Sequence, residues 1–257
     1  MEPLNDESQK VVWITGASSG IGLALVKRYL KSGWQVIASA RTQGELADLI
    51  EHESHLSFVA FDIVDKAQIA PVRDALSQLA PHLDCAILNA GTCEYLDIDG
   101  DTTDWQMMER VMSVNYFGLV NSVDVCLPLL KRASQPHLVG VSSQAVQAAF
   151  PRAEAYGASK AAIRYFLSSL RMDLKADGID VSCILPGFVD TPLTRKNTFD
   201  MPFLMSSDEA AKRTYQALQH RPYEFAFPKR LTALLWLGRH LPKWWLGKLA
   251  PNKHDNL

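Results

Sequence analysis

The chain has 257 residues, of which 47% are hydrophobic and 21% are charged. These values are close to those of globular proteins and exclude a disordered or collagen-like chain. Its 26 Lys and Arg residues against 28 Asp and Glu give a formal net charge of -2. We therefore expect no nucleic-acid partner, because domains that bind nucleic acids are usually strongly basic.

Two further features of the composition limit the classes of protein. The four cysteines follow neither a metal-binding nor a disulfide spacing, so we expect no metal site and interpret the cysteines as small buried side chains. Residues 1–10 are polar and acidic and lack the apolar segment of a signal peptide. No run of about 18 apolar residues follows, so we expect no membrane-spanning helix and a cytoplasmic protein.

Strands and helices are predicted to alternate along the chain, from the periodicity of apolar residues and the positions of turn residues. The predicted strands cover residues 11–15, 35–39, 56–61, 83–88, 137–141, 180–185 and 224–227. The predicted helices cover residues 23–30, 45–51, a segment capped by Asp65, 104–131, 153–176 and a segment that opens with the capping-box pair Ser206 and Glu209. Residues 188–205 are predicted to form a loop. This alternation predicts a single α/β domain with a doubly wound parallel sheet.

The turn between the first strand and the first helix has the sequence Thr-Gly-Ala-Ser-Ser-Gly-Ile-Gly, at residues 15–22. In a doubly wound sheet of the Rossmann type, a dinucleotide pyrophosphate lies in this turn, at the N-terminus of the helix. Glycines are needed there because a side chain would hold the backbone away from the phosphates. The turn predicts a dinucleotide site made by Gly16, Ser18, Ser19, Gly20, Ile21 and Gly22. A tight turn without a ligand is the alternative.

The end of the second strand indicates which dinucleotide is bound. An acidic residue there would accept hydrogen bonds from the adenosine ribose and repel a 2′-phosphate. The chain instead has Arg41, whose planar guanidinium suits a phosphate, and no acid before Glu45. We predict NADP(H) over NAD(H); an arginine that lies in solvent is the alternative.

A second group of residues indicates acid–base chemistry. Tyr156 and Lys160 are four residues apart in a predicted helix, so their side chains share one face. A nearby ammonium group would lower the pKa of the tyrosine, typically by about 1–3 units. Ser143 follows the fifth strand at its carboxyl end, where ligands bind in open α/β sheets, and Asn115 is a polar residue in an otherwise apolar helix. The structural alternatives are a turn cap for Ser143 and a hydrogen-bonded core amide for Asn115.

Together these residues resemble the short-chain dehydrogenase/reductase family. Five short motifs occur in the order and spacing of that family, across residues 11–192: the glycine turn at 15–22, Asn89-Ala90-Gly91, Ser143 thirteen residues before Tyr156, Tyr156-Gly157-Ala158-Ser159-Lys160, and Pro186-Gly187 followed by Thr191. Two positions depart from frequent family patterns. Leu88 replaces the first Asn of an NNAG motif, and Ser19 stands where some NADP-preferring members have a basic residue.

The resemblance implies a catalytic tetrad of Asn115, Ser143, Tyr156 and Lys160. Tyr156 would be the general acid in reduction and the base in oxidation, and Lys160 would lower its pKa and hold the nicotinamide ribose. Ser143 would orient the carbonyl, and Asn115 would hold a water that relays protons to Lys160. The resemblance adds cofactor contacts at Asp62, Asn89, Ala90, Gly91, Pro186, Gly187, Val189 and Thr191. It also implies a homodimer or homotetramer built on the helices at 104–131 and 153–176.

The loops expected around the substrate are apolar. Their side chains are Val146, Phe150, Phe188, Leu193, Phe199, Met201, Phe203, Leu204 and Met205. This set favours a lipophilic ketone, aldehyde or alcohol as the substrate, and a lid that packs on its own domain is the alternative.

The carboxyl-terminal segment 229–257 differs from the rest of the chain. Residues 229–254 contain six Lys or Arg, no acid and three of the six tryptophans. We predict two short amphipathic helices separated at Pro242, as an extension of a domain at 1–228 that binds NADP and carries the catalytic residues. Two interpretations are open for this extension: contact with an anionic membrane surface, or a substrate lid or subunit contact.

The sequence therefore predicts an NADP-dependent oxidoreductase that transfers a hydride between nicotinamide and a carbonyl or alcohol. The alternative is a non-catalytic NADP-binding sensor or scaffold on the same fold, although such a protein would not need Tyr156 or Lys160.

Overall fold

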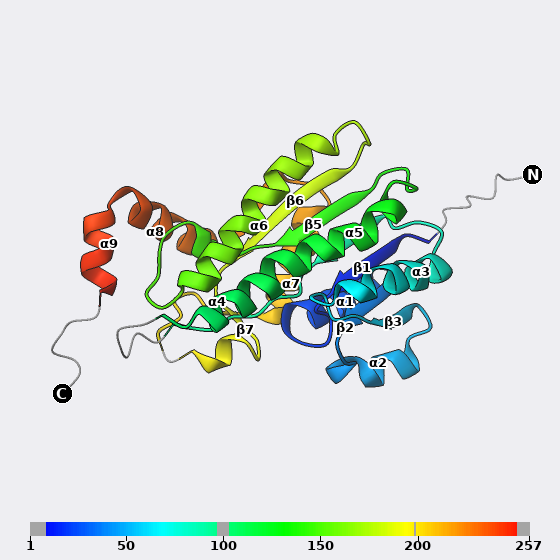
Figure 1. The fold of residues 1–257 in the computed structure, drawn as a ribbon, viewed down its shortest axis with the longest axis horizontal. Helices are drawn as coiled ribbons and strands as arrows, with labels where there is room; N and C mark the ends of the chain where they lie inside the picture. Colours follow the sequence, from blue (N-terminus) through cyan, green and yellow to red (C-terminus); the bar gives the residue numbers. More distant parts are fainter. Residues whose placement is uncertain (1–8, 97–102, 198, 251–257) are drawn as a thin grey trace, which may run out of the picture.

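The centre of the protein is a sheet of seven parallel strands, seen in the computed structural model, which describes residues 9–96, 103–197 and 199–250. The strand order is β3-β2-β1-β4-β5-β6-β9 (Figure 1). The strands are β1 (Val11–Thr15), β2 (Gln35–Ala40), β3 (Leu56–Ala60), β4 (Cys85–Leu88), β5 (His137–Val141), β6 (Asp180–Pro186) and β9 (Glu224–Phe227). The doubly wound parallel sheet predicted from the sequence is confirmed.

Helices cover both faces of this sheet. They are α1 (Gly20–Lys31), α2 (Ala47–His52), α3 (Ile69–Leu79), α4 (Trp105–Met112), α5 (Gly118–Leu130), α6 (Glu154–Asp173) and α7 (Ser207–Leu218). In β1, Trp13 packs with residues of α3, α5 and α6, whereas Val12 and Ile14 pack with residues of α1 and α7. Figure 1 shows α3, α5 and α6 across the nearer face. Because both faces of β1 are buried, its sequence is a continuous apolar run.

The order of the strands creates a crevice beside β1. Ile14 of β1 pairs with Ala38 of β2 on one side and with Ile87 of β4 on the other. The loops that leave the carboxyl ends of β1 and β4 therefore go to opposite sides of the sheet, and ligands of such folds bind in the crevice between them.

The helix predicted at 104–131 is continuous but not uniform. A π-helical turn, Ser113–Phe117, joins α4 to α5 and contains Asn115. Such turns are rare inside α-helices and are frequent at functional sites. By length and composition the 26 residues Trp105–Leu130 could span a membrane, but more than half of their most apolar stretch is buried inside the protein. This is the pattern of a core helix in a globular domain.

Two local predictions need correction, and a third, the cap at Asp65, is confirmed with a 3₁₀ first turn. The predicted loop 188–205 contains a short strand, β7 (Val189–Asp190), which pairs in parallel with β8 (Met205–Ser206). Ser206 accepts a hydrogen bond from the Glu209 amide, but the Glu209 carboxylate pairs with Arg213 at 2.7 Å, so only half of the capping box forms. Asp65 caps the 3₁₀ turn Lys66–Gln68, which precedes α3.

Two helices end the described part of the chain, α8 (Lys229–His240) and α9 (Pro242–Leu249). Pro242 occupies the first turn of α9, where its missing N–H costs nothing, and this confirms the predicted break. Both helices lie at the end of the molecule on the left of Figure 1. Residues 251–257 of the predicted extension lie outside the described residues.

Candidate active site

The glycine turn after β1 packs so closely that side chains are excluded. Gly16 and Gly20 have φ angles of +65° and +55°, in the left-handed region that favours glycine. A Cβ atom on Gly22 would lie 2.1 Å from the carbonyl oxygen of Gly16, and one on Gly16 would lie 2.7 Å from Cα of Ala90. The turn and the start of α1 therefore present bare backbone, which is the cradle that a pyrophosphate needs.

Thr15 and Asn89 fasten this turn to the loop after β4. The Asn89 Nδ2 atom donates to the carbonyl oxygens of Thr15 and Gly16, both at 3.2 Å. Thr15 Oγ1 accepts from the amides of Asn89 and Ala90, at 3.1 and 3.2 Å. Thr15 was not among the predicted site residues. Its signal in the sequence is a hydroxyl at the last position of a buried strand.

A cleft of about 930 Å³, here called the large cleft, runs along the carboxyl ends of the strands. Most of the predicted site residues line it: Gly16, Ser18, Ser19, Ile21, Arg41, Asp62, Asn89, Ala90, Gly91, Ser143, Tyr156, Lys160, Pro186, Gly187, Val189 and Thr191. Gly20, Gly22 and Asn115 do not line the cleft. Its volume lies within the range of small-molecule and cofactor sites, about 300–1,000 Å³.

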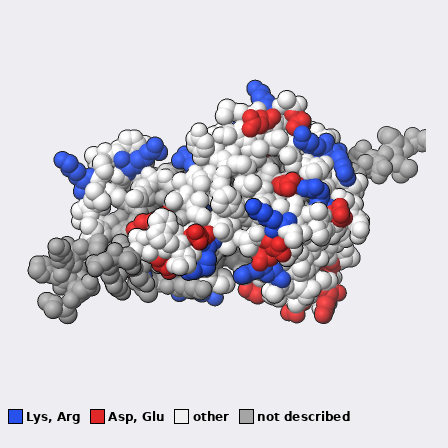
Figure 2. All heavy atoms as spheres, in the orientation of Figure 1, with Lys and Arg blue, Asp and Glu red and all other residues white. Residues whose placement is uncertain are grey.

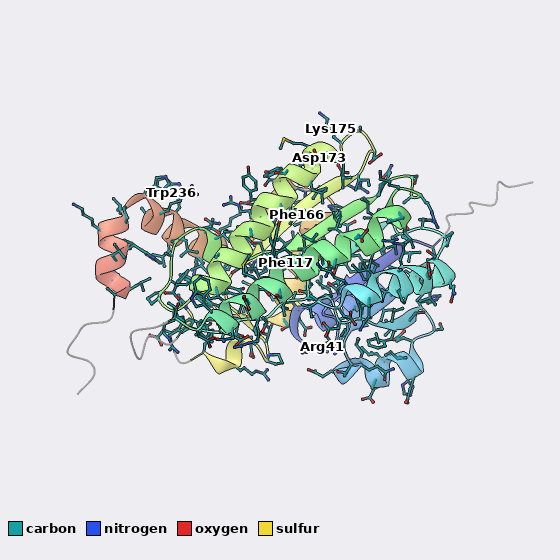
Figure 3. All side chains as sticks on the ribbon, in the orientation of Figure 1. Arg41, Phe117, Phe166, Asp173, Lys175 and Trp236 are labelled. Atoms are coloured by element: carbon teal, nitrogen blue, oxygen red, sulfur yellow. The ribbon has the colours of Figure 1, made fainter. Side chains whose placement is uncertain are left out.

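Arg41 marks one end of the large cleft. It follows the last residue of β2, is exposed, and forms no ion pair with any residue that the structure describes. Figure 3 shows it at the lower edge of the molecule, beside the blue elements of the glycine turn. A free guanidinium at this position could bind an anionic group at the cleft's end.

Tyr156 and Lys160 face the other part of the large cleft from α6. The Lys160 Nζ atom donates to the carbonyl oxygen of Val141, at 3.0 Å, and lies 5.8 Å from the centre of the Tyr156 ring. The neighbouring Ser142 hydroxyl donates to the backbone oxygen of Lys160, at 2.8 Å. These bonds attach α6 to the end of β5, so the two side chains are held where β5 meets the cleft.

Ser143 is placed to donate a hydrogen bond. Its Oγ accepts from the Ala145 amide at 3.1 Å, as the predicted turn cap, and this leaves its own proton free. The same hydroxyl lies close enough to the Tyr156 phenol to lower the pKa of Tyr156. The capping and catalytic interpretations of Ser143 are therefore compatible.

Burial controls the pKa values of the pair. It raises the pKa of Tyr156 to about 12, and the hydrogen bond with Ser143 acts in the opposite direction. Burial also lowers the pKa of Lys160 to about 8. The expectation that Lys160 lowers the pKa of Tyr156 is not met here, because burial disfavours the charged form of each group. At neutral pH the Tyr156 phenol thus carries its proton.

The Asn115 side chain hydrogen bonds to the loop after β4 and to α6. Its Oδ1 accepts from the Thr92 amide at 2.7 Å, and its Nδ2 donates to the Thr92 oxygen and to Ser159 Oγ, at 3.0 and 2.9 Å. A Cβ on Gly91 would lie 3.1 Å from Asn115 Oδ1 and 3.2 Å from Lys160 Nζ. The side-chain amide of Asn115 therefore holds the backbone of Thr92 next to Lys160, as expected for a hydrogen-bonded core amide. Its role in holding a water stays a prediction.

A smaller apolar cavity of about 90 Å³ also adjoins Tyr156, and no residue of the glycine turn lines it. Ser143 and Tyr156 line both this apolar cavity and the large cleft. Of the predicted substrate residues, four line it: Phe150, Phe188, Leu193 and Phe199. The other five do not: Val146, Met201, Phe203, Leu204 and Met205. None of the described residues that line it is charged.

Ten residues of the apolar cavity were not predicted, among them Cys93, Tyr95, Asn197, Leu231 and Leu235. Tyr95 donates to Asn197 Oδ1 at 2.6 Å, which joins two loops that are 102 positions apart in the sequence. All four cysteines are free thiols; Cys85, Cys126 and Cys183 are buried as expected, whereas Cys93 is only partly buried and lines the cavity. No local pattern marks these residues, because they meet only in the folded chain.

Comparison with known proteins identifies the family of this chain. A family model described as short chain dehydrogenase matches residues 10–201. An uncharacterized oxidoreductase of Myxococcus xanthus is 32% identical over 246 residues, which cover 91% of this chain and 94% of that protein. A benzil reductase ((S)-benzoin forming) of Saccharomyces cerevisiae is 35% identical, over 72% of this chain and 74% of that protein. A sulfoacetaldehyde reductase of Chromohalobacter salexigens is 32% identical, over 73% and 76%.

Solved structures share the fold. A short-chain dehydrogenase from Streptomyces avermitilis has a TM-score of 0.78 and 22% identity, over 94% of this chain and 96% of that one. A structure of ElxO with NADP bound has a TM-score of 0.71 and 22% identity, over 81% and 90%. With the family match and the relatives above, these results show that the chain belongs to the short-chain dehydrogenase/reductase family, whose oxidoreductases bind a nicotinamide cofactor.

Proposed function

We propose that this protein is an NADP(H)-dependent reductase of lipophilic ketones or aldehydes, which also oxidises the corresponding alcohols. One observation carries this proposal: Ser143 and Tyr156 line both the large cleft and the apolar cavity. A carbonyl group held by these two hydroxyls would face the large cleft, while the apolar part of the substrate would fill the cavity.

The residues present fit a nicotinamide dinucleotide. The glycine turn leaves no room for side chains at Gly16 and Gly22, so the backbone amides at the start of α1 would bind the pyrophosphate. Asp62 would contact the adenine, and Lys160 the nicotinamide ribose. Val189 and Thr191, with Pro186 and Gly187, would hold the carboxamide end. When bound, the reduced cofactor supplies a hydride to the carbonyl carbon.

Tyr156 provides the proton that the reduction requires. Its raised pKa keeps the phenol protonated at neutral pH, so it can donate to the carbonyl oxygen as this oxygen gains negative charge. Ser143 donates a second hydrogen bond to the same oxygen from the hydroxyl proton that its turn leaves free. In oxidation Tyr156 must first lose its proton, so that direction is favoured by alkaline pH.

Arg41 supports the choice of NADP(H). Its exposed guanidinium at the end of β2 would pair with the 2′-phosphate, where an acidic residue would repel it. To test this, the dissociation constants of NADPH and NADH are measured for the wild type and for Arg41→Ala. The variant should lose about tenfold or more of its NADPH affinity and little of its NADH affinity; equal losses would overturn the assignment.

The lining of the apolar cavity supports an uncharged substrate. Among the relatives, the benzil reductase acts on an aromatic diketone and the sulfoacetaldehyde reductase on an anionic aldehyde. Phe150 and Phe188 pack edge to face beside the cavity, and no charged side chain lines it among the described residues. An anion would find no cationic partner among these lining residues, so we favour aromatic or aliphatic ketones.

The test of the proposed function is NADPH oxidation over a panel of neutral and anionic carbonyl compounds. Turnover of the neutral lipophilic compounds, with little of the anionic ones, is the expected result. A protein that binds NADPH but turns over no member of the panel would instead support the sensor or scaffold hypothesis.

We also propose that the protein forms a homodimer or homotetramer through α6 and the continuous helix made by α4, the π-helical turn and α5. The surface near these helices exposes Phe117, Tyr165 and Met172. Phe117 and Phe166, labelled in Figure 3, lie on neighbouring helices of the same face. Light scattering should give a mass of two or four chains; a monomer would contradict the proposal.

A further inference from the structure

Helix α8 is apolar on two faces, only one of which packs against the protein. Leu231 and Leu235 point inward, are almost fully buried, and line the apolar cavity. Trp236 and Leu237 are 55% and 42% exposed. The inner face already satisfies the packing of the helix, so an outer face with a tryptophan and a leucine requires another explanation.

Exposed apolar side chains also occur at the turn after α8 and in α9. Trp245 points inward: its ring would collide with a Cβ on Gly238, at 2.6 Å, and its Nε1 donates to the Ala149 oxygen at 2.6 Å. With this anchor in place, Leu241, Trp244 and Leu246 stay exposed. We call Trp236, Leu237, Leu241, Trp244 and Leu246 the outer apolar patch. Figure 3 shows Trp236 pointing away from the sheet.

Basic side chains surround this patch without acidic partners. The exposed cations of α8 and α9 are Lys229, Arg230, Arg239, Lys243 and Lys248. No Asp or Glu occurs between 229 and 254, whereas the rest of the chain has 20 basic and 28 acidic residues. None of these five cations forms an ion pair with a residue that the structure describes. In Figure 2 the surface around α8, at the left, shows Lys and Arg side chains.

We propose that α8 and α9 dock this protein on the surface of an anionic lipid bilayer. Tryptophan and leucine would enter the boundary between headgroups and acyl chains, and the lysines and arginines would meet the lipid phosphates. A second copy of the chain is a poorer occupant, because a twofold contact would place this cationic surface against itself.

The first experiment measures binding of the full-length protein to vesicles by sedimentation. Vesicles of equal parts phosphatidylcholine and phosphatidylglycerol are compared with vesicles of phosphatidylcholine alone. We expect strong binding to the anionic vesicles only, and a decrease when salt shortens the screening length from about 10 Å at 0.1 M to about 3 Å at 1 M. No binding to the anionic vesicles, or equal binding to both, would overturn the proposal.

The second experiment assigns the binding to the outer apolar patch. Trp236→Ser should weaken binding to anionic vesicles by about tenfold, whereas the control Trp105→Ser should not, although Trp105 is 70% exposed on α4. Thermal unfolding of both variants confirms that they fold. Equal binding by the two variants would contradict the assignment.

The third experiment tests the charges. Each basic residue near an anionic surface contributes about fivefold to binding, so Arg239→Gln with Lys243→Gln should lose about 25-fold. The matched pair Lys27→Gln with Lys175→Gln, on α1 and after α6, should bind like the wild type. Self-association that Trp236→Ser abolishes, without vesicle binding, would assign the patch to a second copy instead. These measurements need no turnover, so they stand apart from the test of the proposed function.

Discussion

The large cleft and the apolar cavity share Tyr156 and Ser143, yet they are built in different ways. The cleft depends on backbone: the glycine turn leaves no space for a Cβ at Gly16 or Gly22. The cavity depends on side chains from distant segments, such as Tyr95, Phe150 and Leu235. A backbone constraint permits few residue types, whereas an apolar wall accepts many. The cleft should therefore tolerate substitution poorly, and changes in the cavity should alter which substrate is used.

The largest expected effect tests the backbone side of this comparison. Gly22→Ala places a Cβ 2.1 Å from the Gly16 oxygen, so the turn must move. We expect a loss of about 3 kcal/mol in the free energy of unfolding, measured in urea, and a loss of measurable NADPH binding. Gly157→Ala is the control: its Cβ would meet nothing within 4 Å, and in a helix it should stabilise the protein by about 1 kcal/mol. Similar stabilities for the two variants would break the comparison.

The next effect concerns the cost of burying Lys160. Its pKa of about 8 lies below the ordinary value of 10.5, so between these pH values the unfolded chain binds more protons and stability rises with pH. Lys160→Met lacks this dependence. Its stability relative to the wild type should be greatest below pH 8, by up to about 3 kcal/mol, and should decline towards pH 10.5. Urea unfolding across this range measures the difference, and a difference independent of pH would refute it.

A smaller effect tests the apolar cavity, which is built from side chains. Phe150 packs edge to face on Phe188 and Trp245 beside the apolar cavity. Phe150→Ala should lower kcat/KM for a bulky neutral ketone by about tenfold or more, with NADPH affinity unchanged. Phe203→Ala, at an exposed residue outside the cavity, is the matched control. A weaker affinity for NADPH in Phe150→Ala would show that the two regions are not separable.

The same contrast explains how much could be predicted from the sequence. Parallel strands buried on both faces produce continuous apolar runs, so all seven strands of the sheet were predicted to within two residues. About half of the residues that line the large cleft, Ser143, Tyr156 and Lys160 among them, follow from short motifs whose spacing the fold dictates. Cys93, Tyr95 and Leu235 were missed because their proximity arises only from tertiary packing.

Electrostatics was the harder part to predict. A spacing of four residues correctly placed Lys160 near Tyr156, but it does not report burial. Burial raises the pKa of Tyr156 and lowers that of Lys160, and both effects oppose the simple attraction between an ammonium and a phenolate. Similarly, the π-helical turn at Asn115 has no signature in an apolar helical pattern.

The most direct test of the account is Tyr156→Phe, which removes only the hydroxyl that is proposed to give its proton to the substrate. NADPH binding and single-turnover reduction of a good neutral ketone are measured, with the exposed Tyr165→Phe as the control. The account predicts near-normal NADPH binding and a rate about 10²–10⁴-fold lower for Tyr156→Phe, and no change for Tyr165→Phe. A Tyr156→Phe enzyme that reduces the ketone at the wild-type rate would contradict it.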